Sequence, residues 1–194
     1  DRRMTGILKV DTIQKNDGTV PTLADLGISN EVPRFEVRLN QDQTGITDMT
    51  TFVVPFNVTD IDTETGFDSD RTYTIQVAGT YLLHASALLY GNEGKNRDSH
   101  LGILKSTDGG SSYSSIANDG SRHGGTYDQT SQTHNVIVMH QFDVGDKIQV
   151  WSMVNTGDSS GWRVQASSSP IVNYGIGWID NGTRYTRFSG LKIA

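Results

Sequence analysis

The sequence predicts an all-β sandwich preceded by a short N-terminal segment, and two observations support this class. The 194 residues include 21 Gly but only 4 Pro, and 35% are hydrophobic, which suits one modest core enclosed by many turns. After residue 33, apolar and polar residues alternate in short runs separated by turn-forming dipeptides. No run after residue 33 has the spacing of a helix of ordinary length, so a sandwich or barrel is expected.

Residues 35–39 form the clearest strand candidate, because Phe35, Val37 and Leu39 alternate with charged residues. The other expected strands lie at 51–58, 71–77, 80–90, 100–106, 135–142, 147–154, 172–179 and 187–193. Turns are expected between them at 77–80, 107–110, 118–121, 144–146 and 180–183.

The first 33 residues are predicted to be an anchoring segment distinct from the sandwich of residues 34–194. Residues 6–13 could form a short strand, Asp17-Gly18 a turn, and 21–28 one helical turn that ends at Gly27. A segment of this size cannot bury its own apolar side chains. We therefore expect it to dock on a neighbouring protein or on another copy of the chain.

Several expected strands are apolar on both faces. In 80–90, Leu82 and Leu88 lie on the face opposite Tyr81 and Leu83. A single sandwich buries only one face of each sheet, so the simplest cover for the second face is an identical subunit. Long loops of the same chain are the alternative cover. The residues that we expect in the core or in the interface between subunits are Tyr81, Leu83, Trp151, Met153, Tyr174, Ile176, Trp178 and Phe188.

The order of these segments resembles the complement and tumour necrosis factor (TNF) superfamily. The signature of the globular head is matched by the spacing from Phe56 to Asp62 and Phe67, followed by Gly79 and Tyr81. Other similar segments are the opening strand 35–39, the Gly-Asp turn and strand at 142–150, and the closing strand 188–191. The match is partial, since Tyr73 stands one position early and two later aromatic positions are occupied by Leu83 and Ala85. The resemblance implies a ten-stranded TNF-like jelly roll that forms a homotrimer.

The N-terminal segment carries a second resemblance. Residues 6–14, Asp17-Gly18 and residues 22–27 resemble the start of structural proteins of marine and cyanobacterial tailed phages, in which such a jelly roll often follows. This resemblance implies a protein on the surface of a virion, either a tail or neck fibre or a capsid decoration protein. Residues 1–33 would then contact other virion proteins, and the head would bind the host surface or support particle assembly.

One acidic stretch could bind calcium, because oxygen ligands at alternating positions suit a hard cation. Most loops of this composition are simply solvated turns, so we expect no metal or other cofactor as the first interpretation. The candidate ligands are Asp60, Asp62, Glu64, Asp68 and Asp70.

The histidines give a weaker metal signal. His134 and His140 share one face of the expected strand 135–142 if it is regular, but six residues of strand separate them by roughly 20 Å. Ligands from other strands or copies would be required for zinc. His84 lies in a strand that reads as buried, and we expect it to be a core residue.

Two polar regions, 92–99 and 111–133, have the composition of adaptable contact surfaces or of ordinary solvated loops. Tyr113, His123 and Tyr127 are candidate contacts to a host glycan or protein. Trp162 is either another contact or the start of a strand.

Charge and motifs exclude several classes of function. The net charge is −6 without a basic cluster, which argues against nucleic acid, and no apolar run is long enough to span a membrane. There is no cysteine, no Gly-x-Ser-x-Gly elbow and no phosphate-binding glycine loop, so we expect no enzyme. The alternatives are a secreted or cell-surface ligand of the same fold, which should carry a signal or stalk that we do not find, and a glycan-active enzyme.

Overall fold

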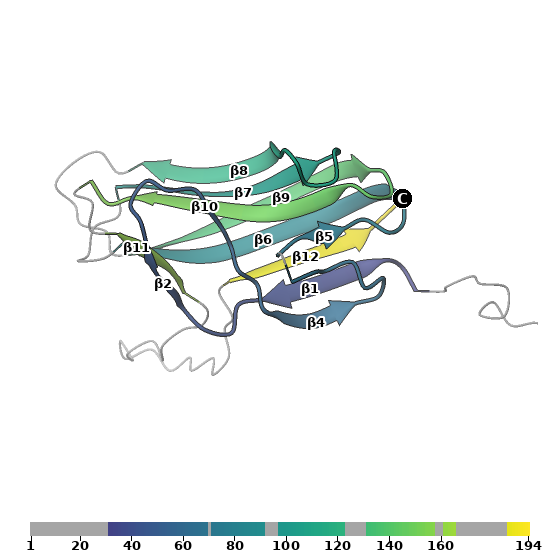
Figure 1. Ribbon diagram of the computed structural model, residues 1–194, viewed down its shortest axis with the longest axis horizontal. Helices are drawn as coiled ribbons and strands as arrows, with labels where there is room; N and C mark the ends of the chain where they lie inside the picture. Colours follow the sequence, from purple (N-terminus) through teal and green to yellow (C-terminus); the bar gives the residue numbers. More distant parts are fainter. Residues whose placement is uncertain (1–30, 70, 92–96, 123–130, 158–160, 166–185) are drawn as a thin grey trace, which may run out of the picture. The chain divides into compact units, whose positions relative to one another are not determined.

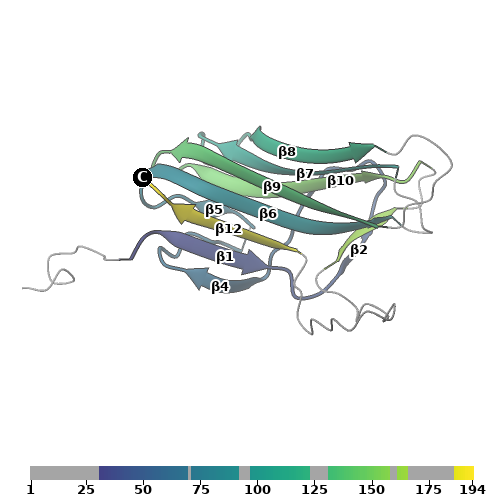
Figure 2. The ribbon, with the colours of Figure 1, turned by 180° about the vertical axis from the view of Figure 1, so that it is seen from behind.

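The computed structural model describes residues 31–69, 71–91, 97–122, 131–157, 161–165 and 186–194. From Pro33 onward the chain forms one compact unit. Two antiparallel sheets pack face to face in it, as Figures 1 and 2 show from opposite sides. The expected all-β sandwich is therefore confirmed.

The first sheet is built around the long strand β6 (Gly79–Gly91). On one edge of β6 lies β9 (Ser131–Phe142), and the other edge pairs with both β11 (Trp162–Gln165) and β12 (Arg187–Lys192). Beyond these two strands the sheet continues through β2 (Gln43–Ile46), β1 (Arg34–Arg38) and β4 (Val58–Asp62).

The second sheet contains β10 (Lys147–Asn155) and β7 (Asp98–Ser106), which pair along their whole lengths. β8 (Ser114–Arg122) pairs with β7, while β3 (Phe52–Val53) and β5 (Tyr73–Thr74) pair with the other edge of β10. Five strands thus make up the described part of this sheet and seven the described part of the first.

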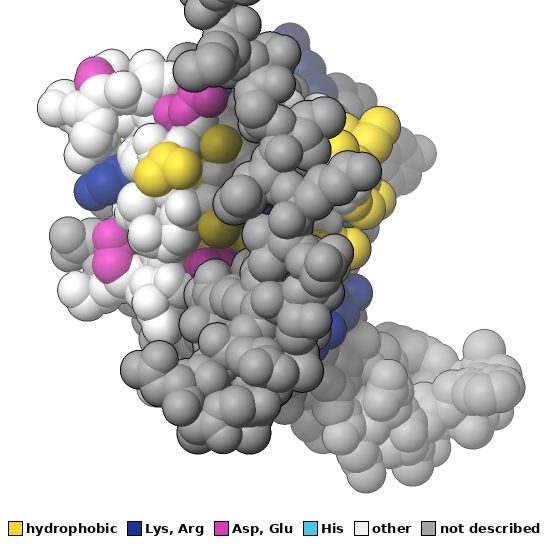
Figure 3. Space-filling view, turned by 90° about the vertical axis from the view of Figure 1, so that its right-hand side faces the viewer, with side chains coloured by type: hydrophobic (Ala, Val, Ile, Leu, Met, Phe, Trp, Pro, Cys, Tyr) yellow, Lys and Arg dark blue, Asp and Glu magenta, His cyan; other side chains and the backbone are white. Residues whose placement is uncertain are grey.

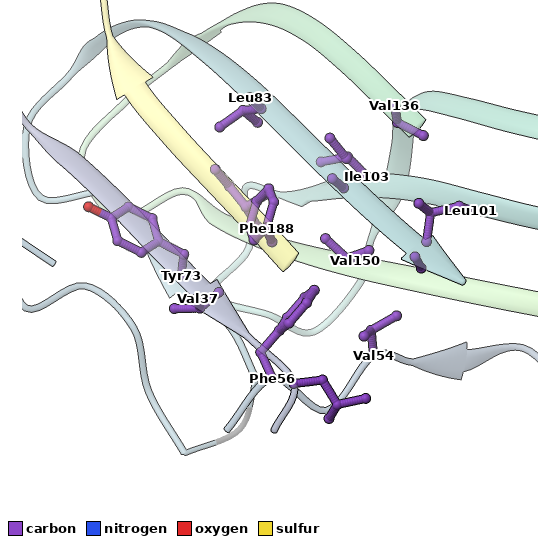
Figure 4. Packing of buried hydrophobic residues seen from close by; sticks show 14 of the residues in the cluster. Val37, Val54, Phe56, Tyr73, Leu83, Leu101, Ile103, Val136, Val150 and Phe188 are labelled. Carbon is purple, nitrogen blue, oxygen red and sulfur yellow. The ribbon is translucent and has the colours of Figure 1, made fainter. Parts of the chain in front are cut away.

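The core lies between the sheets and follows the alternation read in the sequence. In β6 the side chains of Tyr81, Leu83, Ala85, Ala87 and Leu89 are fully buried. Aromatic rings from both sheets meet there: Phe35 stacks on Tyr73 at 3.9 Å between ring centroids, and Phe188 packs edge-on against Phe35 at 4.9 Å. Figure 4 shows Tyr73 and Phe188 among the buried side chains. Burying each such side chain contributes about 1.5–3 kcal/mol.

Six of the expected strands are confirmed with small shifts at their ends, namely those at 35–39, 80–90, 100–106, 135–142, 147–154 and 187–193. The strand expected at 51–58 is wrong: it divides into β3 and the start of β4, because Pro55 has no backbone N–H for a sheet ladder. The strand expected at 71–77 shrinks to the two residues of β5.

The turn predicted at 118–121 is also wrong. Asn118, Asp119, Gly120 and Ser121 lie inside β8, each opposite a residue of β7. The turns at 107–110 and 144–146 do connect strands, with positive φ at Gly109, Gly110 and Gly145. The elements expected at 6–28, 172–179 and 180–183 lie outside the described residues.

The start of β1 and the last residue of the chain lie at the same end of the sandwich. The Lys192 N–H donates to the Pro33 carbonyl at 2.8 Å, and the Thr80 N–H donates to the Ala194 carbonyl at 2.7 Å. The end of β8 and the start of β7 lie at the opposite end (Figure 1). Within the described ranges, no helix is long and apolar enough to cross a membrane.

Candidate interaction surfaces

The outer face of the first sheet carries a cluster of exposed apolar side chains. Met139, Leu82 and Leu191 stand side by side on β9, β6 and β12, and Ile137 of β9 lies opposite His84 of β6. We call this cluster the apolar patch, and its members and exposed fractions are Ile137 (67%), Met139 (66%), Ile193 (47%), Leu191 (41%) and Leu82 (38%).

None of the five members of the apolar patch is charged, and on β1 Arg34 stands beside Leu191 and Glu36 beside Ser189 at its border. His84 and Ser189 face each other in its second row, and Thr80 borders it through a 2.8 Å hydrogen bond to the Gln141 side chain. Arg187 stands one row beyond Ser189, opposite Ser86. Figure 3 shows hydrophobic side chains gathered along the right-hand margin of the molecule, on the side that faces the viewer in Figure 2. Exposed apolar residues grouped in this way mark an interaction site.

The residues expected in the core or in an interface divide between two places. Tyr81, Leu83 and Phe188 belong to the core of the single subunit. Trp151 and Met153 are half-buried on the outer face of the second sheet, remote from the apolar patch. Tyr174, Ile176 and Trp178 lie outside the described residues.

His84 was expected in the core, and this is wrong: it is half-buried on the outer face, between the buried Leu83 and Ala85. Neither Ile137 nor Met139 is among the interface residues expected from the sequence. Their signal was present, because they alternate with Val136 and Val138 along the strand expected at 135–142.

Three hydrogen-bonded side chains, Ser99, His134 and Asp119, follow the order of a Ser-His-Asp triad. Ser99 Oγ lies 2.7 Å from His134 Nε2, and His134 Nδ1 lies 3.0 Å from Asp119 Oδ2. Ser99 is fully buried in the middle strand β7, between β8 and β10, where its backbone is part of the sheet. A nucleophile needs access to substrate and free N–H groups for the oxyanion, and this position offers neither. These hydrogen bonds instead join a strand of one sheet to strands of the other.

The carboxylates of the acidic stretch make ion pairs and hydrogen bonds to other residues of the same chain. Asp60 pairs with Arg38 at 2.9 Å, and Asp62 accepts hydrogen bonds from the backbone N–H groups of Glu64, Gly66 and Phe67. Asp68 accepts the Thr72 N–H at 3.1 Å, whereas Asp70 lies outside the described residues. The described part of the chain contains no group of three or more His, Asp or Glu side chains arranged to hold a metal ion.

The expected contact residues also divide. Tyr113 is half-buried in the connection between β7 and β8. Trp162 is not a surface contact: its side chain is fully buried, its Nε1 donates to the Thr47 carbonyl at 2.8 Å, and it begins strand β11. His123 and Tyr127 lie outside the described residues.

Comparison with known proteins gives a likeness in structure alone. No protein-family model and no curated protein matches the sequence. The structure of Eiger TNF from S. frugiperda is similar with a TM-score of 0.58 and 6% identity, covering 84% of this chain and 93% of that chain. Murine APRIL at pH 5.0 is similar with a TM-score of 0.55 and 10% identity, covering 84% of this chain and all of that chain. The described fold is thus a TNF-like jelly roll, as the sequence resemblance implied, and its described residues form twelve strands where the resemblance implied ten.

Proposed function

We propose that this chain is the homotrimeric head of a virion structural protein that works by binding and assembly. The observation that carries the assembly part is the apolar patch. Five large side chains exposed on one sheet face of a chain with net charge −6 are unfavourable in water unless a partner covers them.

A second copy of the chain is the partner that fits this face. Because the members of the patch are uncharged, copies of the chain can bring this face together around a three-fold axis without repulsion between like charges. TNF-like domains, the fold class of the similar structures, usually form homotrimers. Three copies around one axis would bury the patch of each and leave the second sheet outward.

The virion part of the proposal rests on the N-terminal resemblance. Residues 6–14, Asp17-Gly18 and residues 22–27 resemble the start of tailed-phage structural proteins, so we place the protein on the particle surface as a fibre head or decoration protein. Residues 1–33 would attach it to other virion proteins, and the head would bind a glycan or protein of the host surface. Several heads on one particle would bind a surface far more tightly than one head, because each contact after the first is intramolecular.

A secreted or cell-surface ligand is the second candidate, since the similar structures are of Eiger TNF and APRIL. Immunogold electron microscopy of purified phage particles with an antibody against the head separates the two. Labelled particles support the virion role. Unlabelled particles together with labelled cell surfaces would overturn it.

The assembly part is tested by light scattering of the full chain. The chain mass is 21.2 kDa, so three copies give about 64 kDa. A species of that mass at micromolar concentration is expected. A stable monomer of 21.2 kDa would overturn the trimer.

A further inference from the structure

The outer face of the second sheet is the other broad surface of the sandwich, and neither the core nor the apolar patch uses it. On β10, Gln149, Trp151 and Met153 point outward, alternating with the buried Ile148 and Val150. All three outward side chains are half-buried. They are therefore held in place by their neighbours, and yet they remain accessible.

Two glycines in neighbouring strands make room for two rings on this face. A Cβ atom at Gly102 of β7 would lie 2.2 Å from Trp151 Nε1, so the indole occupies the space over that glycine. A Cβ atom at Gly120 of β8 would lie 2.3 Å from His100 Nδ1, so the imidazole occupies the space over the second. Glycine weakens the interior of a strand, and at these two positions the missing side chain is explained by the ring that packs over it.

The two rings are neighbours on the sheet. Trp151 stands in one row with Gly102 and Asn118, and the adjacent row contains Met153, His100 and Gly120. Each ring leans across one strand in the same direction, the indole from β10 over β7 and the imidazole from β7 over β8. Together they form a stepped platform of two rings, which we call the aromatic platform.

Amide side chains frame the aromatic platform, and an acidic side chain, Asp98, lies at one end of it. Asn118 is exposed beside it, and the Gln149 side chain is oriented by a 2.8 Å hydrogen bond to Thr72 Oγ1. At the end of the platform, Asn155 Nδ2 donates to Asp98 Oδ2 at 3.1 Å. Trp151 Nε1 is buried against Gly102 without a partner within the described residues. The indole thus presents its ring to a ligand, and not its N–H group.

We propose that the aromatic platform binds an uncharged saccharide of the host surface. An indole face with fixed position suits the apolar C–H face of a sugar ring, and nearby amide side chains suit its hydroxyl groups. A charged ligand would need an opposite charge at the centre, whereas Asp98 and Arg122 stand one row beyond His100 and pair with each other at 3.6 Å. A protein partner would need more exposed apolar surface than this half-buried set provides.

Saccharide binding rests on the proposed host-surface role, but its experiment is independent of the experiment that tests the trimer. Light scattering tests the apolar patch on the first sheet, whereas saccharide binding tests the second sheet. Saturation-transfer NMR and tryptophan fluorescence would be recorded for the full chain with neutral hexasaccharides of glucose, of mannose and of N-acetylglucosamine. Sialyllactose and a heparin hexasaccharide would serve as charged probes.

At least one neutral probe is expected to bind, with saturation transfer to its ring protons. Trp151→Ala is expected to weaken that binding about tenfold, the value of one lost aromatic contact, and Trp151→Phe to weaken it less. Asn118→Ala removes an exposed amide beside the aromatic platform, so it should also weaken saccharide binding while the fold is unaffected. Val144→Ala, in the turn between β9 and β10, is the control and should bind as the parent does.

Three outcomes would overturn the proposal. They are no binding of any neutral probe, a preference for the charged probes, or binding that neither Trp151→Ala nor Asn118→Ala weakens.

Discussion

Ser99 Oγ and His134 Nε2 lie 2.7 Å apart inside the sandwich, so a strand of one sheet is joined to a strand of the other by a buried hydrogen bond. Asp119 holds the other nitrogen of the ring and also accepts the backbone N–H of Asn135 at 3.3 Å. The seam between the edge strands β8 and β9 is therefore closed by polar groups at this end.

Replacing His134 should show what this junction contributes. His134→Ala removes two hydrogen bonds and leaves a buried gap, so the free energy of unfolding should fall by about 2–4 kcal/mol. Urea titration followed by circular dichroism measures the loss. Ser115→Ala, at an exposed position of β8, is the control and should change little. Equal stability of the two variants would contradict a structural role for the junction.

A charge placed in the apolar patch should dissociate the trimer. Met139→Glu puts three carboxylates into the proposed interface, and we expect the dissociation constant to rise by more than about 100-fold. Val144 provides a matched control, because it is 64% exposed against 66% for Met139 but lies in a turn outside the patch. Light scattering across a dilution series would then find Val144→Glu as a trimer and Met139→Glu as a monomer. A trimeric Met139→Glu variant would place the interface elsewhere.

Tyr73 carries a buried hydroxyl without a hydrogen-bond partner among the described residues. Burial, reinforced by Asp62, raises the pKa of Tyr73 above its ordinary value. The unfolded chain therefore loses this proton first as the pH rises past about 10, and the stability of the parent should fall there. Tyr73→Phe should be at least as stable at pH 7 and should lose less stability between pH 9 and 11. Chemical denaturation at pH 7, 9 and 11 measures both effects, and a large loss at pH 7 would contradict them.

His140 should lower the stability of the protein as the pH falls, whereas Tyr73 lowers it as the pH rises. The pKa of His140 is lowered by burial and then by the charge of Lys105, while Asp146 opposes the shift. The folded chain thus binds this proton less readily than the unfolded chain, so the contribution is complete above about pH 6.5 and is lost as the pH falls. His140→Gln should reduce the loss of stability between pH 7 and pH 5, as measured by thermal unfolding. An unchanged pH dependence in the variant would show that other groups control it.

Asp62 organises the turn after β4 through its three backbone hydrogen bonds. Asp62→Ala should lower the free energy of unfolding by about 1–3 kcal/mol, because these N–H groups lose their acceptor. Thermal unfolding with calcium chloride and with chelator tests the other interpretation of this acidic stretch. A melting temperature that rises with calcium in the parent, but not in Asp62→Ala, would assign the carboxylate to an ion instead.

Alternation in the sequence predicted the central strands well, because burial on one face leaves a period of two. The pattern of Tyr81, Leu83 and Ala85 against Leu82 and Leu88 matches the two faces of β6. The same alternation revealed a second apolar face, although it did not say which of the two-faced strands would carry the exposed patch. That choice depends on which strands join which sheet, and strand pairing is determined by contacts between residues distant in the sequence.

The edge strand β8 was not predicted, because its composition is that of a loop. Asn118, Asp119, Gly120 and Ser121 are residue types that favour turns, but here they pair with β7. Gly120 has no side chain because the His100 ring occupies that space, and Asp119 faces inward toward His134. Both reasons are contacts between strands distant in sequence, so no local pattern could report them. For the same reason, burial of Trp162 beneath the Thr47 carbonyl was not predicted.

The shared end of β1 and the C-terminus has a practical consequence for engineering. Cargo fused after Ala194 would emerge beside Pro33 and the turn before β6, because backbone hydrogen bonds tie both positions to that end. A fluorescent protein or enzyme attached there would stand away from the start of β7 and the end of β8. The fused cargo and the start of β7 would accordingly occupy opposite ends of the sandwich, which leaves that far end open for display.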